Sequence, residues 1–332
     1  MQHAIRVEQL SFSYPGSREQ TLTDLSFSFQ PATVYGFLGP SGAGKSTTQK
    51  ILYGLLGGYR GSARISGTEV SRWGAQLYTR TGIGFETPNL YLKLTGRENL
   101  EFALALHEAA GRRGRRGSGP DRSSLQNIDH AAERLGLRDA LDTRIETWSK
   151  GMRMRLAFIR AVLHQPEILF LDEPTSGLDP MWARAVKDWI AEVREAGAAV
   201  FLTTHSMELA DEVCDTVGFL VDGHIVAEGA PTDLRQRLGR RAIKVQGADR
   251  HGVAREAEYA YDELLSHPIE GFARIDRITN REVTLEQVFL ELTGRSLRDG
   301  TPTGAPAVGV EPRADGDGVS PPRSSSSSES LS

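Results

Sequence analysis

A glycine-rich segment near the start of the chain has the residue types needed to hold a row of phosphate groups. Residues 39–46 read GPSGAGKS and match the pattern G-x-x-x-x-G-K-[ST], with an apolar run before them and a helical pattern after them. The glycines let backbone N–H groups face the phosphates, and the N-terminus of the following helix adds partial positive charge. Lys45 would neutralise the β- and γ-phosphates, and Ser46 would ligate Mg²⁺. A glycine-rich turn without a ligand is the alternative. The positions expected to contact a nucleotide are Gly39, Pro40, Ser41, Gly42, Ala43, Gly44, Lys45, Ser46 and Thr47.

Acidic residues and a histidine follow two further apolar runs. Asp172 and Glu173 come directly after the run at 168–171, where the carboxyl ends of parallel strands bind ligands. Asp172 would hold Mg²⁺ directly or through water, and Glu173 would polarise an attacking water molecule. His205 follows the run at 199–202 and could contact the γ-phosphate and position that water. A solvated turn and a structural hydrogen bond are the alternatives, and the phosphate-binding pattern in the same chain favours the catalytic interpretation.

The elements that would position these residues alternate between strand and helix. Short continuous apolar runs at 34–38, 168–171 and 199–202 are typical of buried strands in a parallel sheet. Residues 182–193 return apolar side chains to one helical face, and 217–227 predict a hairpin around Asp222-Gly223. Near-alternation at 5–12 and 25–29 predicts two half-exposed strands. We therefore expect an α/β layered core with a small antiparallel addition at its front.

Composition excludes several classes of protein. The chain has 332 residues with 39 Lys+Arg and 43 Asp+Glu, and this balance argues against a protein that coats nucleic acid. Its one cysteine, Cys214, cannot form a disulfide within the chain. No run approaches ~18 apolar residues, and the first residues lack the layout of a signal peptide. We expect a soluble cytoplasmic protein that does not bind nucleic acid.

Two stretches have a composition that does not support a packed core. Residues 111–124, GRRGRRGSGPDRSS, predict a flexible surface loop between two helices, with a patch for acidic lipid or polyphosphate as the alternative. Residues 296–332 are rich in Gly, Pro and Ser and predict a disordered tail. Between them, Thr284-x-x-Gln287 predicts a capping box that opens a short amphipathic helix.

Over residues 3–294 the combination resembles the ATP-binding subunit of an ABC transporter. The signature segment of that family corresponds to 148–152, WSKGM, in which Ser149 lies 23 residues before Asp172. The resemblance implies that Ser149 and Gly151 reach the γ-phosphate held by an opposing subunit, so that two subunits pack head to tail around two ATP molecules. Residues 176–179 resemble the D-loop, with Asp179 at its end, and His205 takes the role of the switch histidine.

The same resemblance gives an aromatic residue a role at the adenine ring. Tyr14 falls where the family stacks an aromatic side chain on adenine, a contact of about 1–3 kcal/mol by analogy with other base-stacking proteins. An exposed tyrosine at a strand end is the alternative.

Two departures from the common family pattern resemble one subgroup, the ABC-2 type ATPases of drug-resistance and bacitracin- or lantibiotic-export systems. Lys150 and Met152 replace the usual Gly and Gln of the signature, and Glu86 occupies the position of a loop glutamine. Glu86 can accept a hydrogen bond from water or approach Mg²⁺, but it lacks an N–H donor. Residues 284–294 also resemble the closing segment of that subgroup.

The resemblance implies an ATPase that powers a membrane exporter through ATP-driven dimerisation, with ATP and Mg²⁺ as cofactors. A separately encoded membrane permease would bind residues 86–99, with Pro88, Leu90 and Tyr91 as apolar anchors or, alternatively, as a buried subdomain core. A homodimer at the cytoplasmic face of the membrane is the expected assembly. The alternative is a soluble ABC ATPase that remodels a complex, as in iron–sulfur assembly; a neighbouring gene with about six apolar spans would favour export.

The implied fold is that of a P-loop NTPase, with a RecA-like core, an antiparallel β subdomain and a helical subdomain at about 87–160. The cassette is expected to occupy residues 1–238. A small α+β domain would follow at 239–295, and the tail at 296–332.

Overall fold

The computed structural model describes residues 3–111, 122–239, 242–261, 269–281 and 283–294. The predicted tail at 296–332 and most of the predicted loop at 111–124 lie outside these residues. At the edges of that loop the prediction was too wide, because Gly111 ends one helix and Arg122 begins the next. Within the described residues, no helix combines the length and apolarity needed to cross a membrane.

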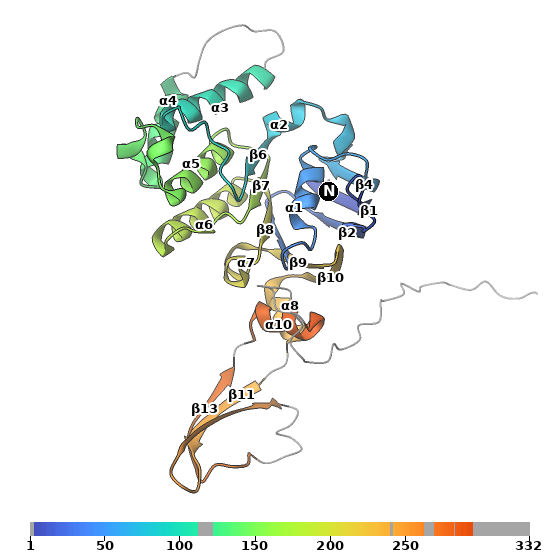
Figure 1. Cartoon of the computed structure of the whole chain (residues 1–332), viewed down its shortest axis with the longest axis vertical. Coiled ribbons are helices and arrows are strands. Elements are labelled where there is room, and N and C mark those ends of the chain that lie inside the picture. The colour runs from blue at the N-terminus through green and yellow to red at the C-terminus, as the bar shows by residue number, and fades with distance from the viewer. Residues whose placement is uncertain (1–2, 112–121, 240–241, 262–268, 282, 295–332) are drawn as a thin grey trace, which may run out of the picture.

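A six-stranded sheet forms the centre of the molecule, as the apolar runs predicted (Figure 1). Its strand order is β10-β9-β3-β8-β7-β6, and every pair is parallel except β9 with β10. The bounds are β3 Val34–Leu38, β6 Thr81–Gly84, β7 Ile168–Asp172, β8 Ala199–Thr204, β9 Thr216–Val221 and β10 His224–Gly229. The carboxyl ends of β3, β7 and β8 therefore meet at one edge, which is where the predicted site residues follow them.

Both faces of this sheet are covered. Along β3, Val34 and Leu38 join a core shared with the helices, whereas Tyr35 and Phe37 join a core shared with the N-terminal sheet. α6 Pro180–Glu195 and α7 Met207–Val213 contribute to the first of these cores, whereas α1 Lys45–Leu52 and α2 Gln76–Arg80 contribute to the second. Burial on both faces explains why these strands are continuously apolar.

The predicted antiparallel addition is a four-stranded sheet, β2-β1-β4-β5. Its strands are β1 Ile5–Phe12, β2 Leu22–Phe29, β4 Arg60–Ile65 and β5 Thr68–Glu69. Phe27 and Phe29 of β2 stack against Tyr35 and Phe201 of the central sheet, with ring centroids 5.1–6.2 Å apart. These aromatic contacts hold the two sheets together.

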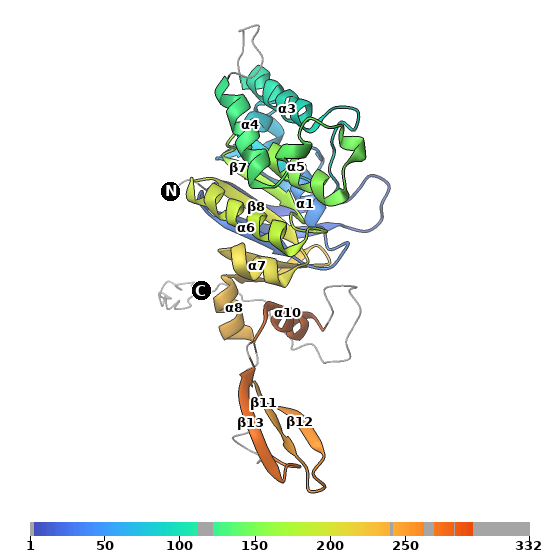
Figure 2. The same ribbon diagram turned by 90° about the vertical axis from the view of Figure 1, so that its left-hand side faces the viewer.

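The helical subdomain lies at one end of the molecule (Figures 1 and 2). It contains α3 Gly96–Gly111, α4 Arg122–Arg134 and α5 Lys150–Val162. Short 3₁₀ turns at Arg138–Ala140 and Ile145–Thr147 join α4 to α5, and another at Val70–Arg72 precedes α2. The predicted hairpin is present: Asp222 and Gly223 have φ of 48° and 80° between β9 and β10.

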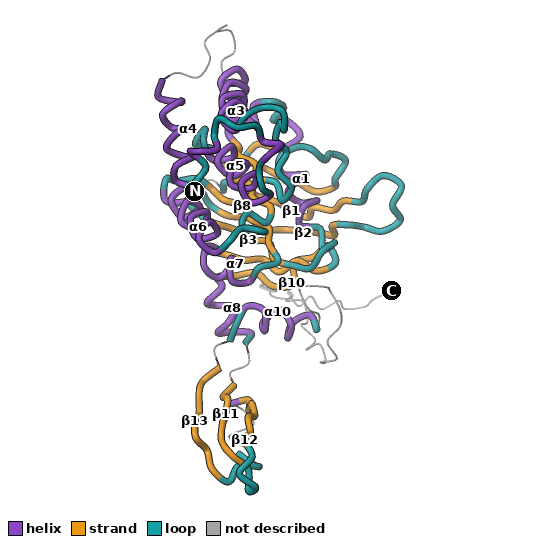
Figure 3. The backbone as a smooth tube through the Cα atoms, turned by 60° about the vertical axis from the view of Figure 1, so that its left-hand side comes forward, coloured by secondary structure: helices purple, strands orange, loops and turns teal. Residues whose placement is uncertain are grey.

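The C-terminal part has two components with different packing. A three-stranded antiparallel sheet, β12-β11-β13, extends away from the cassette (Figure 3). Its strands are β11 Ala242–Ala248, β12 Ala254–Ala260 and β13 Arg274–Arg281; α8 Pro231–Leu238 precedes it and α10 Leu285–Thr293 follows it. The predicted capping box of α10 is present, but this helix packs on the cassette, where Phe289 contacts Phe219 at 5.4 Å between ring centroids. The 239–295 segment is therefore not one packed unit, because α10 buries its apolar face against α7, α8 and β9.

A stacked pair of histidines joins α3 to the end of α5. The rings of His107 and His164 lie 3.7 Å apart at 13°, and His164 Nε2 donates to the Thr81 carbonyl oxygen at 3.1 Å. Among the described residues, His164 Nδ1 is buried without a hydrogen-bond partner. Burial, with the neighbouring His107, lowers the pKa of His164 to about 4, and burial also lowers the pKa of His107. Both rings are therefore neutral near pH 7.

This pair predicts a dependence of stability on pH. Because the pKa of His164 is about 4 when folded and 6.5 ordinarily, the unfolded chain takes up the proton first. Above about pH 6.5 the neutral, buried His164 ring therefore does not lower the free energy of unfolding. As the pH falls from 6.5 towards 4, the free energy of unfolding decreases. We expect the free energy of unfolding to decrease by on the order of 2 kcal/mol between pH 6.5 and pH 4.5. Urea unfolding would measure this decrease. His164→Gln should reduce this loss, whereas the exposed His130→Gln should not; equal losses in both variants would contradict the assignment.

Candidate functional site

The glycine-rich loop forms the floor of a cavity of about 460 Å³ at the carboxyl edge of the sheet. The loop joins β3 to α1, and Lys45 is the first residue of that helix. Gly44 has φ of 107°, and a Cβ there would lie 2.5 Å from Leu22 Cδ2. A Cβ at Gly39 would lie 2.1 Å from the Leu220 carbonyl oxygen, so both positions require glycine. The cavity is lined by Tyr14, Thr21, Ser41, Gly42, Gly44, Lys45, Ser46, Thr47, Glu86, Asp172, Glu173 and His205.

Lys45 supplies the positive charge of this cavity. Its Nζ donates to the carbonyl oxygens of Gly39 and Pro40 at 2.6 and 3.0 Å, which curls the loop around the ammonium group. Burial lowers the pKa of Lys45, and the carboxylates of Glu173, Asp172 and Glu86 act in the opposite direction. An anionic phosphate chain would complete the charge balance of a partly buried cation of this kind.

Asp172 and Ser46 place two oxygen ligands side by side. Ser46 Oγ donates to Asp172 Oδ2 at 3.3 Å, and the Thr203 hydroxyl donates to the other carboxylate oxygen. Within the described residues there is no group of three acidic, histidine or cysteine side chains that could hold a metal ion. One carboxylate and one hydroxyl suit Mg²⁺, which usually completes its coordination with phosphates and water. Glu86 lines the same cavity from an exposed position.

Glu173 is held in a single orientation by the end of β8. Its Oε2 accepts from the Thr204 hydroxyl at 2.8 Å, and its Oε1 accepts from the His205 backbone N–H at 2.7 Å and from His205 Nδ1 at 2.6 Å. The residue is 8% exposed and has φ of 48°, an unusual backbone conformation for a residue with a side chain. Such strain is found where surrounding contacts fix a functional group. The structure thus brings Glu173 and His205 into direct contact.

Tyr14 lies at the rim of the cavity. Its hydroxyl is 3.1 Å from Thr47 Oγ1, and its ring packs edge-on against Phe12 with 5.0 Å between centroids. The side chain remains accessible, and the residue is 37% exposed. This position is compatible with a stacking surface for a flat ring.

Six residues assigned to the site from the sequence do not line the cavity: Gly39, Pro40 and Ala43 of the loop itself, and Ser149, Gly151 and Asp179 from elsewhere in the chain. Ser149 caps α5, where its hydroxyl accepts from the Met152 N–H at 3.2 Å. Asp179 occupies the equivalent position before α6, and both residues are exposed. A methyl group added at Gly151 would approach the Gly177 carbonyl to 3.8 Å, so the signature segment lies next to residues 176–179. The two segments are neighbours of each other and do not line the cavity.

Two threonines orient the two carboxylates, and no role was predicted for them from the sequence. Thr203 and Thr204 end β8 directly before His205 and bind Asp172 and Glu173 from the neighbouring strand. The signal was a pair of hydroxyl residues at the end of an otherwise apolar run. The strand order that makes them neighbours of β7 was not readable from the sequence.

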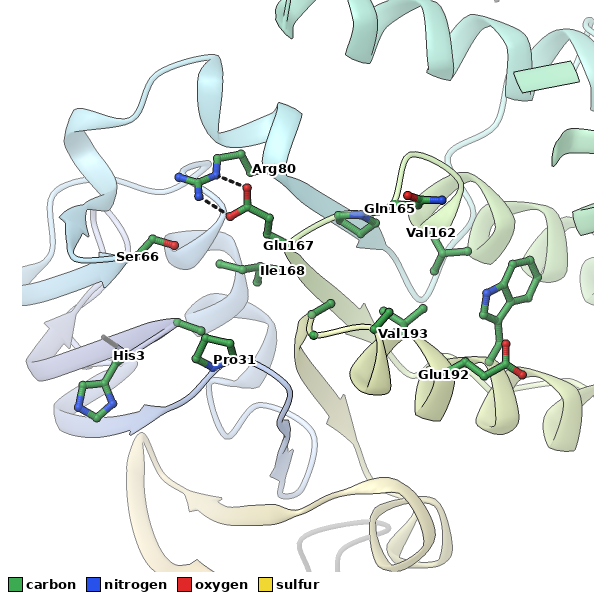
Figure 4. A pocket seen from close by; sticks show the side chains of 16 residues that line it. His3, Pro31, Ser66, Arg80, Val162, Gln165, Glu167, Ile168, Glu192 and Val193 are labelled. Carbon is green, nitrogen blue, oxygen red and sulfur yellow. Dashed lines mark hydrogen bonds and ion pairs between the residues drawn. The ribbon is translucent and has the colours of Figure 1, made fainter. Parts of the chain in front are cut away.

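A larger hollow of about 740 Å³ lies at the opposite, amino-terminal ends of the strands (Figure 4). The ion pair between Arg80 and Glu167 lies across it, and His3 and Pro31 line its other side. It contains none of the residues of the phosphate-binding loop. Lys45, Asp172, Glu173 and His205 therefore lie at the carboxyl edge of the sheet, away from this hollow.

The chain is similar in sequence and in structure to known proteins. A family model described as ABC transporter matches residues 22–176. The Fluoroquinolones export ATP-binding protein of Mycobacterium tuberculosis is 43% identical over 297 residues, which cover 88% of this chain and 94% of that protein. The Nod factor export ATP-binding protein I of Rhizobium meliloti is 33% identical, with 89% and 90% covered. A solved structure, described as the ATP binding subunit of ABC transporter, matches with a TM-score of 0.64 and 28% identity over 71% of this chain and 93% of that chain.

Lys45 predicts a specific loss of nucleotide binding. Lys45→Ala removes the cation that faces the phosphates, so we expect the affinity for ATP to fall by about 100-fold, as for a charge-assisted contact of 1.5–3 kcal/mol. Isothermal titration calorimetry on the purified chain would measure it. Lys50→Ala on the exposed side of the same helix is the matched control. An unchanged affinity in Lys45→Ala would remove the loop from the site.

Proposed function

The chain belongs to the family of ABC transporter ATP-binding proteins, and from this premise we propose that it powers an ABC-2 type membrane exporter. It is an ABC transporter ATPase. One observation carries the proposal: residues of the phosphate-binding loop line the same cavity as Asp172, Glu173 and His205. We assign the cassette to residues 1–238, followed by the accessory segment at 239–295 and the tail at 296–332.

Hydrolysis is phosphoryl transfer to water, in which the protein positions groups and neutralises charge. Lys45 and the amides of its loop bind the phosphates of ATP. Mg²⁺, held by Ser46 and Asp172 with Glu86 nearby, would neutralise further negative charge. Glu173 accepts a hydrogen bond from the attacking water, and its contacts with Thr204 and His205 fix the carboxylate for that role. Tyr14 provides a stacking surface for adenine.

The site is completed by a second copy of the chain. Ser149 and Asp179 are exposed, Gly151 is half-buried, and none of the three lines the cavity of its own chain, which supports a role on the nucleotide of a partner. The first turn of α5 contains no acidic residue, so its N-terminus can face an anion. Each chain carries both halves, so a head-to-tail homodimer contains two equivalent sites.

Export is supported by the relatives that match along most of their length. Two are named for export of fluoroquinolones and of Nod factor, and the Linearmycin resistance ATP-binding protein LnrL of Bacillus subtilis is 29% identical over 89% of this chain and all of that protein. The first two names state export, and the third states resistance to linearmycin. We extend that direction of transport to this chain.

An apolar groove of about 760 Å³ is the proposed docking surface for the membrane permease. Tyr91, Phe102 and Leu106 line it and are 41–56% exposed, and the rings of Tyr91 and Phe102 contact each other edge-on at 5.2 Å. His107 and His164 line it in neutral form, and the Arg160 guanidinium donates to the Asn89 carbonyl. Of the other expected anchors, Pro88 and Leu90 are only half-buried and sit beside Tyr91. An apolar segment of the permease fits this groove, and binding there would keep the chain at the cytoplasmic face of the membrane.

Glu173→Gln tests the catalytic assignment. The amide keeps the size of the side chain but is a much weaker base, so we expect ATP binding to persist and turnover to fall by about 10²–10⁴-fold. Phosphate release and ATP affinity would be measured on the same preparation. Glu208→Gln, an exposed residue of α7, is the control. Turnover within a few-fold of the unmodified protein would exclude Glu173 from this role.

Tyr91→Ser and Phe102→Ser test the docking surface. Each removes an exposed apolar side chain from the groove, so we expect less permease to co-purify in detergent while ATP affinity stays unchanged. Val253→Ser, at a residue 61% exposed near the C-terminal sheet, is the matched control. Equal recovery of the permease with all three variants would exclude the groove.

A further inference from the structure

Arg155 lies beneath the signature segment and is almost completely buried. It is 8% exposed, one helical turn after Gly151 on α5. Its Nε lies 3.4 Å from the Gly151 carbonyl oxygen, and an amino group of the guanidinium donates to the Leu135 carbonyl oxygen at the end of α4. Burial lowers the pKa of Arg155, and the carboxylate of Asp179 opposes that effect. The guanidinium therefore joins α5, the helix that follows the signature residue Ser149, to α4. It also lies close enough to Asp179 of the D-loop for the two charges to interact.

The third contact of Arg155 is an aromatic ring in the first turn of α6. The guanidinium carbon lies 4.3 Å from the ring centroid of Trp182, the geometry of a cation–π interaction. The outer edge of the six-membered ring lies against the backbone just after α4. Gly136 there has φ of 62°, and a Cβ on it would lie 2.2 Å from Trp182 Cη2. Trp182 is thus fixed between α4 and Arg155, three residues after Asp179.

A second arginine–tryptophan pair joins the same helices without touching the signature segment. The guanidinium carbon of Arg134 on α4 lies 4.4 Å from the ring centroid of Trp189 on α6, and both of its amino groups donate to Glu192 at 2.6 Å. This pair holds α4 against α6. The first pair adds a connection from α6 to α5 directly below Gly151.

We infer that Arg155 and Trp182 are positioning residues that hold the signature segment and the D-loop in one fixed arrangement. The two segments would then meet a second copy of the chain as a single preformed surface, because Arg155 contacts the carbonyl of Gly151 while Trp182 lies in the first turn of the helix that Asp179 precedes. Neither side chain lines the ATP cavity. The inference rests on the proposed head-to-tail homodimer, and it predicts that loss of the contact weakens closure of the dimer without weakening the first binding of ATP.

The test uses the full chain carrying Glu173→Gln, in which bound ATP should not turn over. Two quantities are measured: the affinity for a fluorescent ATP analogue at low protein concentration, and the ATP-dependent dimer by light scattering. Adding Trp182→Ala should raise the ATP concentration needed for half-dimerisation by about tenfold or more, the scale expected when a small misplacement disrupts an assembled site. The affinity of the monomer should change by less than about twofold. Trp182→Phe, which keeps an aromatic ring, should restore most of the dimer.

Trp189→Ala is the matched control, because it breaks the other arginine–tryptophan pair between α4 and α6. It should leave ATP-dependent dimerisation at the level of the Glu173→Gln parent. Equal dimerisation by Trp182→Ala and the parent would overturn the inference, as would equal weakening by Trp182→Ala and Trp189→Ala. Failure of the parent itself to dimerise with ATP would instead reject the head-to-tail homodimer.

A second variant covers loss of folding. If Trp182→Ala abolishes the cooperative thermal transition, Arg155→Lys is measured in its place, since lysine keeps the charge but lacks the planar group that stacks on Trp182 and donates to Leu135. Weaker dimerisation with unchanged monomer affinity would support the inference. Dimerisation equal to that of the parent would overturn it.

Discussion

Burial of both faces of β3, β7 and β8 is the constraint on which the remaining structure depends. Successive side chains of each strand enter two different cores: Val34 and Leu38 face the helices, whereas Tyr35 and Phe37 face the aromatic cluster of the N-terminal sheet. A one-residue slip would place each set in the wrong core, so the register of the parallel strands is tightly specified. The three carboxyl ends are consequently fixed beside one another, and side chains that follow them meet within hydrogen-bond distance.

Charge at this edge is arranged in a mutually dependent set. Lys45 is partly desolvated and is stabilised by the carboxylates of Asp172, Glu173 and Glu86. The carboxylates of Asp172 and Glu173 in turn accept hydrogen bonds from hydroxyl groups of β8. Glu173, whose backbone φ is 48°, also accepts a hydrogen bond from His205. The proposed catalytic groups are therefore oriented by the protein itself, which would reduce the reorganisation that hydrolysis requires.

The molecule presents its functional residues on separate surfaces, and the proposed mechanism follows from that separation. The cavity is the proposed ATP site, the segments at 148–152 and 176–179 lie outside it, and the apolar groove is lined by residues of α3 and β6. If ATP closes two copies of the chain, the helical subdomain that carries the signature also carries one wall of the groove. The contacts of Arg155 and Trp182 join α4, α5 and α6. Movement of the helical subdomain would therefore be transmitted to α6 through them.

The sequence by itself determined the features that depend on neighbouring residues. The loop at 39–46, the hairpin at Asp222-Gly223 and the capping box at Thr284 were all predictable, because a turn or a cap is specified within a few positions. Only the tertiary structure decided which distant residues meet: Thr204 with Glu173, Phe289 with Phe219, and Arg155 with Trp182. Those pairings follow from strand order and helix packing, which arise from burying apolar surface over the whole chain. For that reason α10, expected on a small C-terminal domain, packs on the cassette instead.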